Sequence, residues 1–338
     1  MKILKKSLLG FVAVVALGAS NIAAYATELT ISTWLPPSHP MTAVAMPNLA
    51  EMISDATDGT VTAVIKTGVG SPVRMIDFVQ DGVIDIAYMF NGYNPGRFTG
   101  TKIIELPGYE GGAEAISVAY WRAHEKYLAK LNEHKGVKVI GLMVHGAGQL
   151  HVNKSITDLA SLSGKKIRVG GGVMGAVAKG LGIIGVKAPG PKVYEILASG
   201  VADGVMMPAG ERKFLKVNEV TDQMVQTPGG FYRGAFSIIM SQEKYDTLSN
   251  AEKAGLDKVF GEQVSAMAGS AWEKGDGQGV ALTKETNKPI INLSAEDEVK
   301  LDEVFAKVTK DVYAELEAKG VPAAEAHAFI KAQIKAYK

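Results

Sequence analysis

A glycine-rich stretch, KKIRVGGGVMG over residues 165–175, combines residue types that could bind a ligand. Gly170, Gly172 and Gly175 match the dinucleotide-binding pattern G-x-G-x-x-G, and Glu195 follows twenty residues after the last glycine. Arg168 stands beside them, and its planar guanidinium can hold a carboxylate or sulfonate through two parallel hydrogen bonds. The stretch therefore indicates either a nicotinamide cofactor or an acidic group as the bound species.

The residues around the glycines favour the acidic group. A strand that leads into a dinucleotide loop is buried on both faces and apolar, whereas here Lys166 and Arg168 alternate with aliphatic residues. Glu195 falls inside the predicted helix KVYEILASG, not at the end of a strand where a ribose-binding acid belongs. We predict no cofactor. We expect Arg168 to bind the ligand and Gly170 to let it approach the backbone, unless Arg168 is a surface residue or pairs with a carboxylate of its own lobe.

Patterns typical of catalysis are missing from the sequence. It has no cysteine, no H-E-x-x-H, no G-x-S-x-G elbow and no P-loop, so we predict neither a catalytic residue nor a metal site. His145 and His151 flank GAGQL at the end of a predicted strand, where they could reach a cleft. We expect His124, His134 and His327, which fall on charged helical stretches, to be solvated.

The first 26 residues predict export. Lys2, Lys5 and Lys6 precede the apolar run LLGFVAVVALG, and AYA at 24–26 is a small-x-small cleavage site. An uncleaved membrane anchor is the alternative, although the apolar run is short for a membrane span. We predict a cleaved signal peptide over 1–26 and a mature periplasmic protein. Without the three signal lysines the chain has 33 basic and 35 acidic residues, so no nucleic-acid partner is expected.

The elements that must position Arg168 alternate between strand and helix. The mature chain, about 310 residues long, exceeds what one hydrophobic core usually holds, which favours two lobes. The alternation predicts α/β lobes with largely parallel sheets. We expect strands over 28–34, 61–68, 84–90 and 137–144, helices over 43–56, 73–80 and 113–134, and mostly helix over 242–277 and 295–337.

One pattern occurs twice. QDGVIDIAYMF and ASGVADGVMMP share a helix end, Gly-Val-x-Asp and an apolar strand, which places Asp85 and Asp203 at equivalent positions. We expect the glycines to end the helices and each aspartate to hold its turn through local backbone hydrogen bonds. The repeat favours one such unit in each of two similar lobes with a cleft between them, although a common turn used twice by chance is the alternative.

Several blocks together resemble the solute-binding proteins of TRAP transporters, the DctP-type receptor family. The block over 155–208, SITDLASLSGKKIRVGGGVMGAVAKGLGIIGVKAPGPKVYEILASGVADGVMMP, is similar to the signature of that family. ISTWLPPSHPM, ATDGTV, VQDGVIDIAYMFNGY, ELPGYEGGAEA and IIMSQEKYDTLSNAEKAGL resemble it in order and spacing. The resemblance covers essentially the whole mature chain.

The resemblance implies a non-enzymatic, two-lobed periplasmic binding protein of type II-like α/β fold, with a long interlobe helix and a helical C-terminal region. Lobe I would span 27–150, with about 236–275 returning to it, and lobe II would span 151–235, with about 276–338 packing across both lobes. The arginine of the family falls on Arg168. The other positions implied to line the cleft are Trp34, His39, Asn91, Tyr93, Met207, Glu211, Phe231 and Tyr232, and His151 is a candidate from its place beside GAGQL.

One position departs from the family pattern. Many members carry Asn before the proline of the DG..NP motif, whereas this chain has Met207, whose thioether cannot donate a hydrogen bond. We predict a partly apolar pocket around one anion-binding residue, formed by Met207 and the aromatic residues Trp34, Tyr93, Phe231 and Tyr232. Trp34 and Phe231 could instead be core residues. An aromatic or other monoanionic acid, or a small sulfonate, fits better than a dianion. The implied partners are the small and large integral membrane subunits, and the alternative is an exported two-lobed enzyme acting on such an acid.

Overall fold

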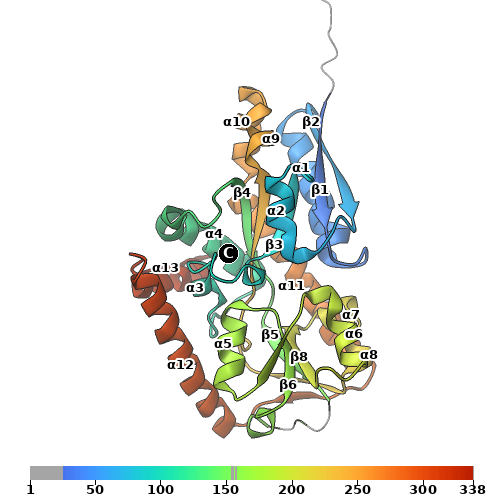
Figure 1. Cartoon of the computed structure of the whole chain (residues 1–338), viewed down its shortest axis with the longest axis vertical. Helices are drawn as coiled ribbons and strands as arrows, with labels where there is room; N and C mark the ends of the chain where they lie inside the picture. The colour runs from blue at the N-terminus through green and yellow to red at the C-terminus, as the bar shows by residue number, and fades with distance from the viewer. Residues whose placement is uncertain (1–25, 154–155, 157, 338) are drawn as a thin grey trace, which may run out of the picture.

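Two mixed β-sheets, each covered by helices, form the two lobes of the molecule (Figure 1). The structure, a computed structural model, describes residues 26–153, 156 and 158–337. All but the last residue of the predicted signal peptide lies outside that part of the chain. None of the described helices is long and apolar enough to cross a membrane.

The first lobe is built on a five-stranded sheet. The residues of its central strands are buried, because the rest of the molecule covers both faces of these strands. The strands, in spatial order, are β2 (Val61–Thr67), β1 (Thr27–Thr33), β3 (Ile86–Phe90), β10 (Ala235–Ser241) and β4 (Val137–Val144). The helices that follow these strands in the chain are α1 (Met46–Ala56), α2 (Met75–Gln80), α3 (Lys102–Glu105), α4 (Ala113–Ala123), α9 (Gln242–Thr247) and α10 (Asn250–Val259).

The second lobe is built on a six-stranded sheet. The strands, in spatial order, are β11 (Ile290–Asn292), β9 (Gln223–Gln226), β5 (Gly148–Val152), β8 (Gly204–Pro208), β6 (Lys166–Val169) and β7 (Ile184–Lys187). Its helices are α5 (Gly172–Gly180), α6 (Val193–Ala198), α7 (Glu211–Phe214) and α8 (Val217–Val220). Arg168 lies on β6, next to the strand β8 that carries Met207.

Both sheets are mixed, which corrects the expectation of largely parallel sheets. β1 pairs in parallel with β2 and β3, and β6 pairs in parallel with β7 and β8. The exceptions are β10 and β5, each antiparallel to both of its neighbours. These two strands are the ones that enter a sheet directly after the chain has left the other, so they run against the strands that the βαβ units supply.

The duplicated Gly-Val-x-Asp pattern occupies equivalent places in the two lobes. Gly82 and Gly200 end their helices with φ of +68° and +69°. Oδ2 of Asp85 accepts hydrogen bonds from the backbone N–H and hydroxyl of Thr30 on β1, and Oδ2 of Asp203 accepts the N–H of Lys166 on β6. The aspartates therefore tie their strand to its parallel neighbour, whereas we expected purely local bonds.

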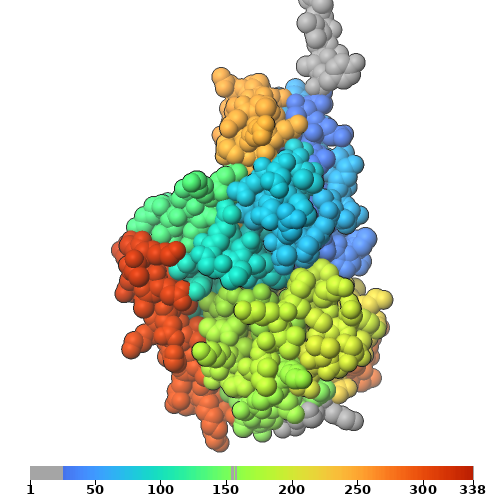
Figure 2. Space-filling view, in the orientation of Figure 1, coloured from blue at the N-terminus to red at the C-terminus, as the bar shows by residue number. Residues whose placement is uncertain are grey.

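Long helices connect the two lobes. α11 (Glu262–Glu285) packs on α4 and β4 of the first lobe and on α7 of the second. α12 (Ala295–Glu317) packs on α5, and α13 (Ala323–Ala336) packs on α4, so the C-terminal segment contacts both lobes (Figures 1 and 2). The helix predicted over 113–134 is regular only as far as Ala123, and a π-helical and a 3₁₀ turn follow it.

Candidate functional site

A small cavity lies between the lobes and is lined from both of them. It measures about 30 Å³ and most of its wall is aromatic or aliphatic. Ligand pockets for small molecules usually measure several hundred cubic ångströms, so an organic acid would enter only if the lobes moved apart or side chains rearranged. The lining residues are Trp34, Leu35, Phe90, Tyr93, His145, Arg168, Met174, Gly190, Met207, Pro208, Glu211, Tyr232, Phe236 and Trp272.

Arg168 is the cation of this cavity. It is 2% exposed, and its Nε and Nη2 donate to the carbonyl oxygen of Ala188 at 2.9 and 2.6 Å. Nη2 also lies 3.5 Å from the hydroxyl of Tyr93 in the first lobe. These contacts hold the guanidinium by one edge, which fixes its direction within the cavity.

No carboxylate of the described residues lies within 4.0 Å of the Arg168 guanidinium. A buried cation is costly unless it is paired and hydrogen-bonded. Arg212, the fully buried arginine of the second lobe, is surrounded by neutral acceptors, among them Oδ1 of Asn218 and the carbonyl of Gln223. Arg168 differs from it because it borders a cavity that both lobes enclose.

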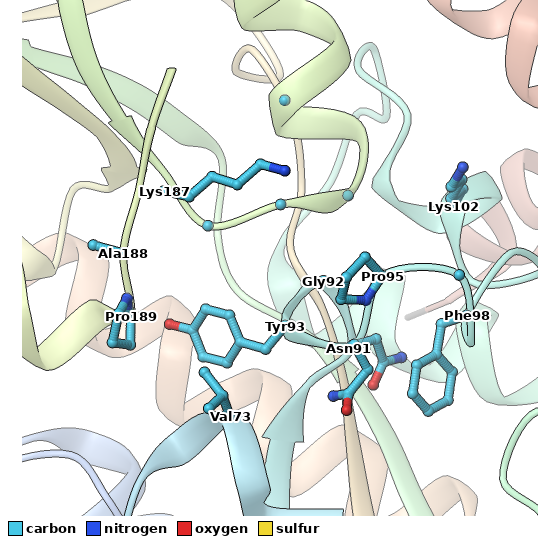
Figure 3. Close-up of a pocket in the computed structure, with 16 residues that line it drawn as sticks. Val73, Asn91, Gly92, Tyr93, Pro95, Phe98, Lys102, Lys187, Ala188 and Pro189 are labelled. Carbon is cyan, nitrogen blue, oxygen red and sulfur yellow. The ribbon is translucent and has the colours of Figure 1, made fainter.

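Tyr93 joins the lobes at the edge of the cavity. Its hydroxyl accepts the backbone N–H of Gly190 at 2.7 Å, and its ring packs edge-on against Phe90 with 4.9 Å between the ring centroids. Figure 3 shows the Tyr93 ring pointing from the loop of the first lobe toward Ala188 and Pro189 of the second. A side chain at Gly190 would point toward Tyr93, Met207 and Trp34, so glycine keeps this wall of the cavity free.

A larger groove of about 540 Å³ lies beside the cavity, where the lobes meet at the surface (Figure 3). It is lined by the loop 91–96 of the first lobe and by residues 170–172 and 187–189 of the second. The lobes approach each other closely at Gly171, where a Cβ atom would lie 2.3 Å from the carbonyl oxygen of Gly92. Asn91 and Gly170 border this groove and do not line the cavity.

Glu105 links the lobes at the start of α5. Its Oε2 accepts the N–H of Val173 at 2.7 Å, and its Oε1 accepts the N–H of Ala235 at 3.3 Å. The carboxyl group is 2% exposed, and desolvation raises its pKa to about 7, against the lowering effect of these backbone hydrogen bonds. The positive end of the α5 dipole favours a negative charge at this place, so Glu105 stabilises the contact between the lobes.

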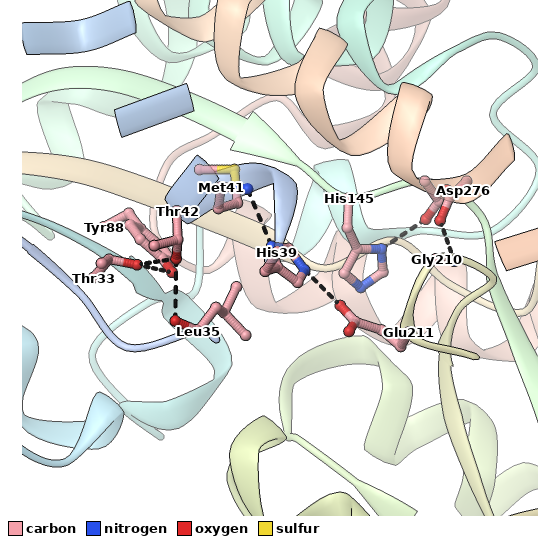
Figure 4. A network of polar contacts seen from close by, with 11 residues as sticks. Thr33, Leu35, His39, Met41, Thr42, Tyr88, His145, Gly210, Glu211 and Asp276 are labelled. Carbon is pink, nitrogen blue, oxygen red and sulfur yellow. Dashed lines mark hydrogen bonds and ion pairs between the residues drawn. The ribbon is translucent and has the colours of Figure 1, made fainter. Parts of the chain in front are cut away.

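A second polar network crosses the interface at Glu211, which lines the cavity (Figure 4). Nε2 of His39 lies 3.2 Å from Oε1 of Glu211, and His39 also packs edge-on against Trp272. Asp276 of α11 accepts the N–H of Gly210 at 2.8 Å. Burial raises the pKa of Asp276 to about 7, and burial lowers the pKa of His145 to about 3, so this imidazole is neutral at physiological pH.

Six of the predicted site residues line the cavity, and five do not. His39 contacts Oε1 of Glu211, and His151 is fully buried, with its Nε2 2.9 Å from the carbonyl oxygen of Met207. Phe231 is fully buried in the core, which was the alternative we left open for it. The last two that do not line the cavity, Asn91 and Gly170, border the groove. The six that line the cavity are Trp34, Tyr93, Arg168, Met207, Glu211 and Tyr232.

The expectation of solvated histidines is wrong for two positions. His134 and His327 are each 7% exposed. Nε2 of His134 lies 2.7 Å from the hydroxyl of Ser237 on β10, and Nδ1 of His327 lies 2.6 Å from the hydroxyl of Tyr313. Both segments are charged in sequence, but each imidazole has a polar partner inside the fold that the sequence did not indicate.

Metal ligands do not cluster in the described part of the chain: no group of three or more His, Asp or Glu side chains is placed to hold an ion.

Sequence reasoning missed eight cavity residues or gave them no role in binding. His145 was considered only as a histidine that could reach a cleft. The others come from separate elements and carry no motif: Leu35, Phe90, Met174, Gly190, Pro208, Phe236 and Trp272.

Comparisons with known proteins agree with the two-lobed architecture. The family model described as "Bacterial extracellular solute-binding protein, family 7" (DctP) matches residues 31–316. The outer membrane transporter protein TsaT of Comamonas testosteroni is 30% identical over 237 residues, which are 69% of this chain and 70% of that protein.

Two solved structures share the fold across almost their whole length. A TRAP periplasmic solute-binding protein from Bordetella bronchiseptica, with bound (R)- and (S)-mandelate, is 32% identical with a TM-score of 0.89. The match covers 91% of this chain and 99% of that one. A TRAP solute-binding protein from an unidentified marine microbe, specific for aromatic acid ligands and in complex with 3-hydroxybenzoate, is 27% identical with a TM-score of 0.84, covering 93% and 99%.

Proposed function

The chain belongs to the bacterial extracellular solute-binding proteins of family 7, the receptors of TRAP transporters for small organic acids, and on this premise we propose that its ligand is an aromatic monocarboxylate. Arg168 binds the carboxylate, and the aromatic side chains around it hold the ring. The observation that supports this most directly is a buried guanidinium without a carboxylate partner among the described residues, in a cavity whose walls are mostly apolar.

The charge of the cavity favours a monoanion over a dianion. Of the residues that line it, Arg168 is the cation and Glu211 is an acid, and burial keeps His145 neutral. A second carboxylate on the ligand would meet Met207, whose sulfur accepts only weakly and donates nothing. The mandelate and 3-hydroxybenzoate bound by the two related structures are monocarboxylates with an aromatic ring, which agrees with this selection.

Binding would proceed by closure of the lobes. The cross-lobe contacts of Tyr93, Glu105 and His39 exist only when the lobes meet, and a ligand touching both lobes adds its own contacts to the same state.

A receptor of this kind changes nothing in its ligand. We therefore propose a non-enzymatic role, in which the chain is exported to the periplasm, cleaved after Ala26, and delivers its ligand to the small and large integral membrane subunits of its transporter.

A thermal-shift screen tests the ligand class. The purified mature chain would be heated with mandelate, phenylacetate, benzoate and 3-hydroxybenzoate, and with succinate, galactonate, toluenesulfonate and NAD as contrasting compounds. A ligand that binds only the folded state increases the free energy of unfolding, by about 2.7 kcal/mol at a hundred times its Kd, and so raises the melting temperature. We expect stabilisation by aromatic monocarboxylates. Stabilisation by succinate or galactonate with none by aromatic acids would contradict the proposal, and so would chemical turnover of a bound acid.

A further inference from the structure

Two polar atoms without partners belong to residues that line the same cavity. In the described part of the chain, four buried side-chain nitrogen or oxygen atoms have no hydrogen-bond partner. Two of them are Oε2 of Glu211 and Nε1 of Trp272, on residues that are 1% and 4% exposed and that both line the interlobe cavity. One is an acceptor and the other a donor. Because unsatisfied buried polar atoms are rare in folded proteins, this pair calls for an explanation.

His39 contacts both residues, and Figure 4 shows its imidazole beside the Glu211 carboxylate. Nδ1 of His39 accepts the backbone N–H of Met41 at 3.1 Å, so in the neutral imidazole Nε2 carries the proton and donates to Oε1 of Glu211 at 3.2 Å. The imidazole also contacts the Trp272 ring, with 4.8 Å between centroids and 75° between planes. One oxygen of Glu211 is thereby occupied, and the second is left for another donor.

The two atoms are complementary to a hydroxyl group. A hydroxyl donates one hydrogen bond and accepts others, so it can donate to Oε2 of Glu211 and accept from Nε1 of Trp272. An ammonium group offers three donors and no acceptor, so it would leave the indole N–H unpaired. A second carboxylate could accept from the indole but would bring a negative charge to Glu211.

Tyr232 lines the same cavity, and its hydroxyl donates to the carbonyl oxygen of Met206 at 3.2 Å. Burial raises the pKa of its phenol, and among the smaller influences Arg168 lowers that pKa while Glu211 raises it. Arg168 and Glu211 make no ion pair with each other, so a ligand carboxylate at Arg168 and a ligand hydroxyl at Glu211 would occupy different parts of one cavity.

We propose that this receptor selects aromatic acids that carry a hydroxyl group, and that Glu211 and Trp272 are the residues that recognise it. The proposal rests on the proposed function, since it presumes that an aromatic carboxylate binds at Arg168. His39 is a positioning residue, which orients Glu211 without touching the ligand.

Matched pairs of acids test the proposal by isothermal titration of the mature chain. Mandelate differs from phenylacetate by a hydroxyl on the side chain, and 3-hydroxybenzoate differs from benzoate by a hydroxyl on the ring. For at least one pair we expect the hydroxylated acid to bind about 10- to 100-fold more tightly, as for a hydrogen bond to a charged group. Glu211→Gln and Trp272→Phe should each reduce that ratio several-fold, because each weakens or removes one of the two hydrogen bonds.

Glu105→Gln is the matched control, because Glu105 is also a buried interlobe carboxyl group but does not line the cavity. It should change the affinity for both members of a pair by the same factor. Equal binding of both acids by the unmodified chain would overturn the proposal and leave the proposed function intact, and this is the result if a water molecule occupies the hydroxyl's place. A preference that survives in both cavity variants would overturn it too. Binding of none of the four acids would instead refute the proposed function.

Discussion

Tyr93 of the first lobe accepts a hydrogen bond from the backbone N–H of Gly190 in the second lobe, with 2.7 Å between oxygen and nitrogen. The same hydroxyl lies 3.5 Å from Nη2 of Arg168. One side chain therefore contacts the opposite lobe and the guanidinium at once, which connects closure of the lobes to the position of the anion-binding residue.

Tyr93→Phe should weaken binding moderately. The variant keeps the ring that packs on Phe90 and loses the acceptor of the Gly190 N–H. A neutral hydrogen bond contributes about 1 kcal/mol net, so we expect Kd for an aromatic monocarboxylate to rise about fivefold in isothermal titration. Tyr194→Phe, a change at an exposed tyrosine of the second lobe, is the control. Unchanged affinity in Tyr93→Phe would show that this contact does not contribute to closure.

Gly171→Ala should impair closure. Gly171 has φ of +126°, and a Cβ atom there would lie 2.3 Å from the carbonyl oxygen of Gly92 across the interface. Alanine at this φ costs about 1–3 kcal/mol of backbone strain in either state, whereas the overlap with Gly92 exists only when the lobes meet. The overlap therefore lowers the population of the closed state, and the apparent Kd rises by the factor by which that population falls. We expect about tenfold weaker binding or worse.

Gly175→Ala, four residues further on, is the matched control for Gly171→Ala. Gly175 lies within α5 and a Cβ atom there meets nothing within 4 Å, so alanine should retain affinity and stabilise the helix by roughly 0.5–1 kcal/mol. Wild-type affinity in Gly171→Ala, or a larger loss in Gly175→Ala, would contradict the close approach at Gly92.

Stability should rise with pH between about 5 and 6.5. Burial lowers the pKa of His134, His145 and His151 to about 3, so between that value and about 6.5 the unfolded chain binds more protons than the folded one, and raising the pH favours folding. Burial raises the pKa of Glu105 and Asp276 to about 7. Between their unfolded pKa values and about 7 the folded chain binds more protons at these two acids, so they make folding less favourable as the pH rises. Each group contributes at most about 1.4 kcal/mol per pH unit, and the histidines outnumber the acids.

Urea unfolding of the mature chain at pH 5 and pH 7 checks the direction. Glu105→Gln removes one opposing contribution, so the rise in the free energy of unfolding between these pH values should become larger, by about 2 kcal/mol if the whole raised pKa acts. Glu110→Gln, a change at an exposed glutamate nearby, should leave the rise unaltered. A smaller rise in Glu105→Gln than in the unmodified chain would contradict the raised pKa of this carboxyl group.

The strands and helices were largely predictable because hydrophobic periodicity specifies them locally. The alternation of Lys166 and Arg168 with aliphatic residues indicated a strand with one polar face, and the structure places Arg168 of that strand at the cavity. The antiparallel directions of β5 and β10 were not predictable in this way, because they follow from where the chain crosses between the lobes, a long-range property that no local pattern carries.

The cavity was only partly predictable for the same reason. Trp34 and Met207 lie in blocks that resemble the receptor family, and the resemblance also implied Tyr232, so all three were expected at the cleft. Trp272 lies in the middle of a 24-residue helix, and nothing in its neighbours separates it from a core residue. Glu105 lies in a block that resembles the family, but its bond to Val173 joins residues 68 positions apart, so only the folded arrangement shows its role.

Isothermal titration of the mature chain and its Arg168→Ala variant with mandelate and benzoate tests most directly whether Arg168 binds the carboxylate of an aromatic acid. Removing one partner of a buried charge pair costs about 2–5 kcal/mol, so the variant should bind the better of the two acids at least about 30-fold more weakly. Arg74→Ala, a change at an exposed arginine, should bind normally, and an unaltered circular dichroism spectrum would show that Arg168→Ala is folded. Equal affinity of the folded Arg168→Ala variant and the unmodified chain would contradict the account.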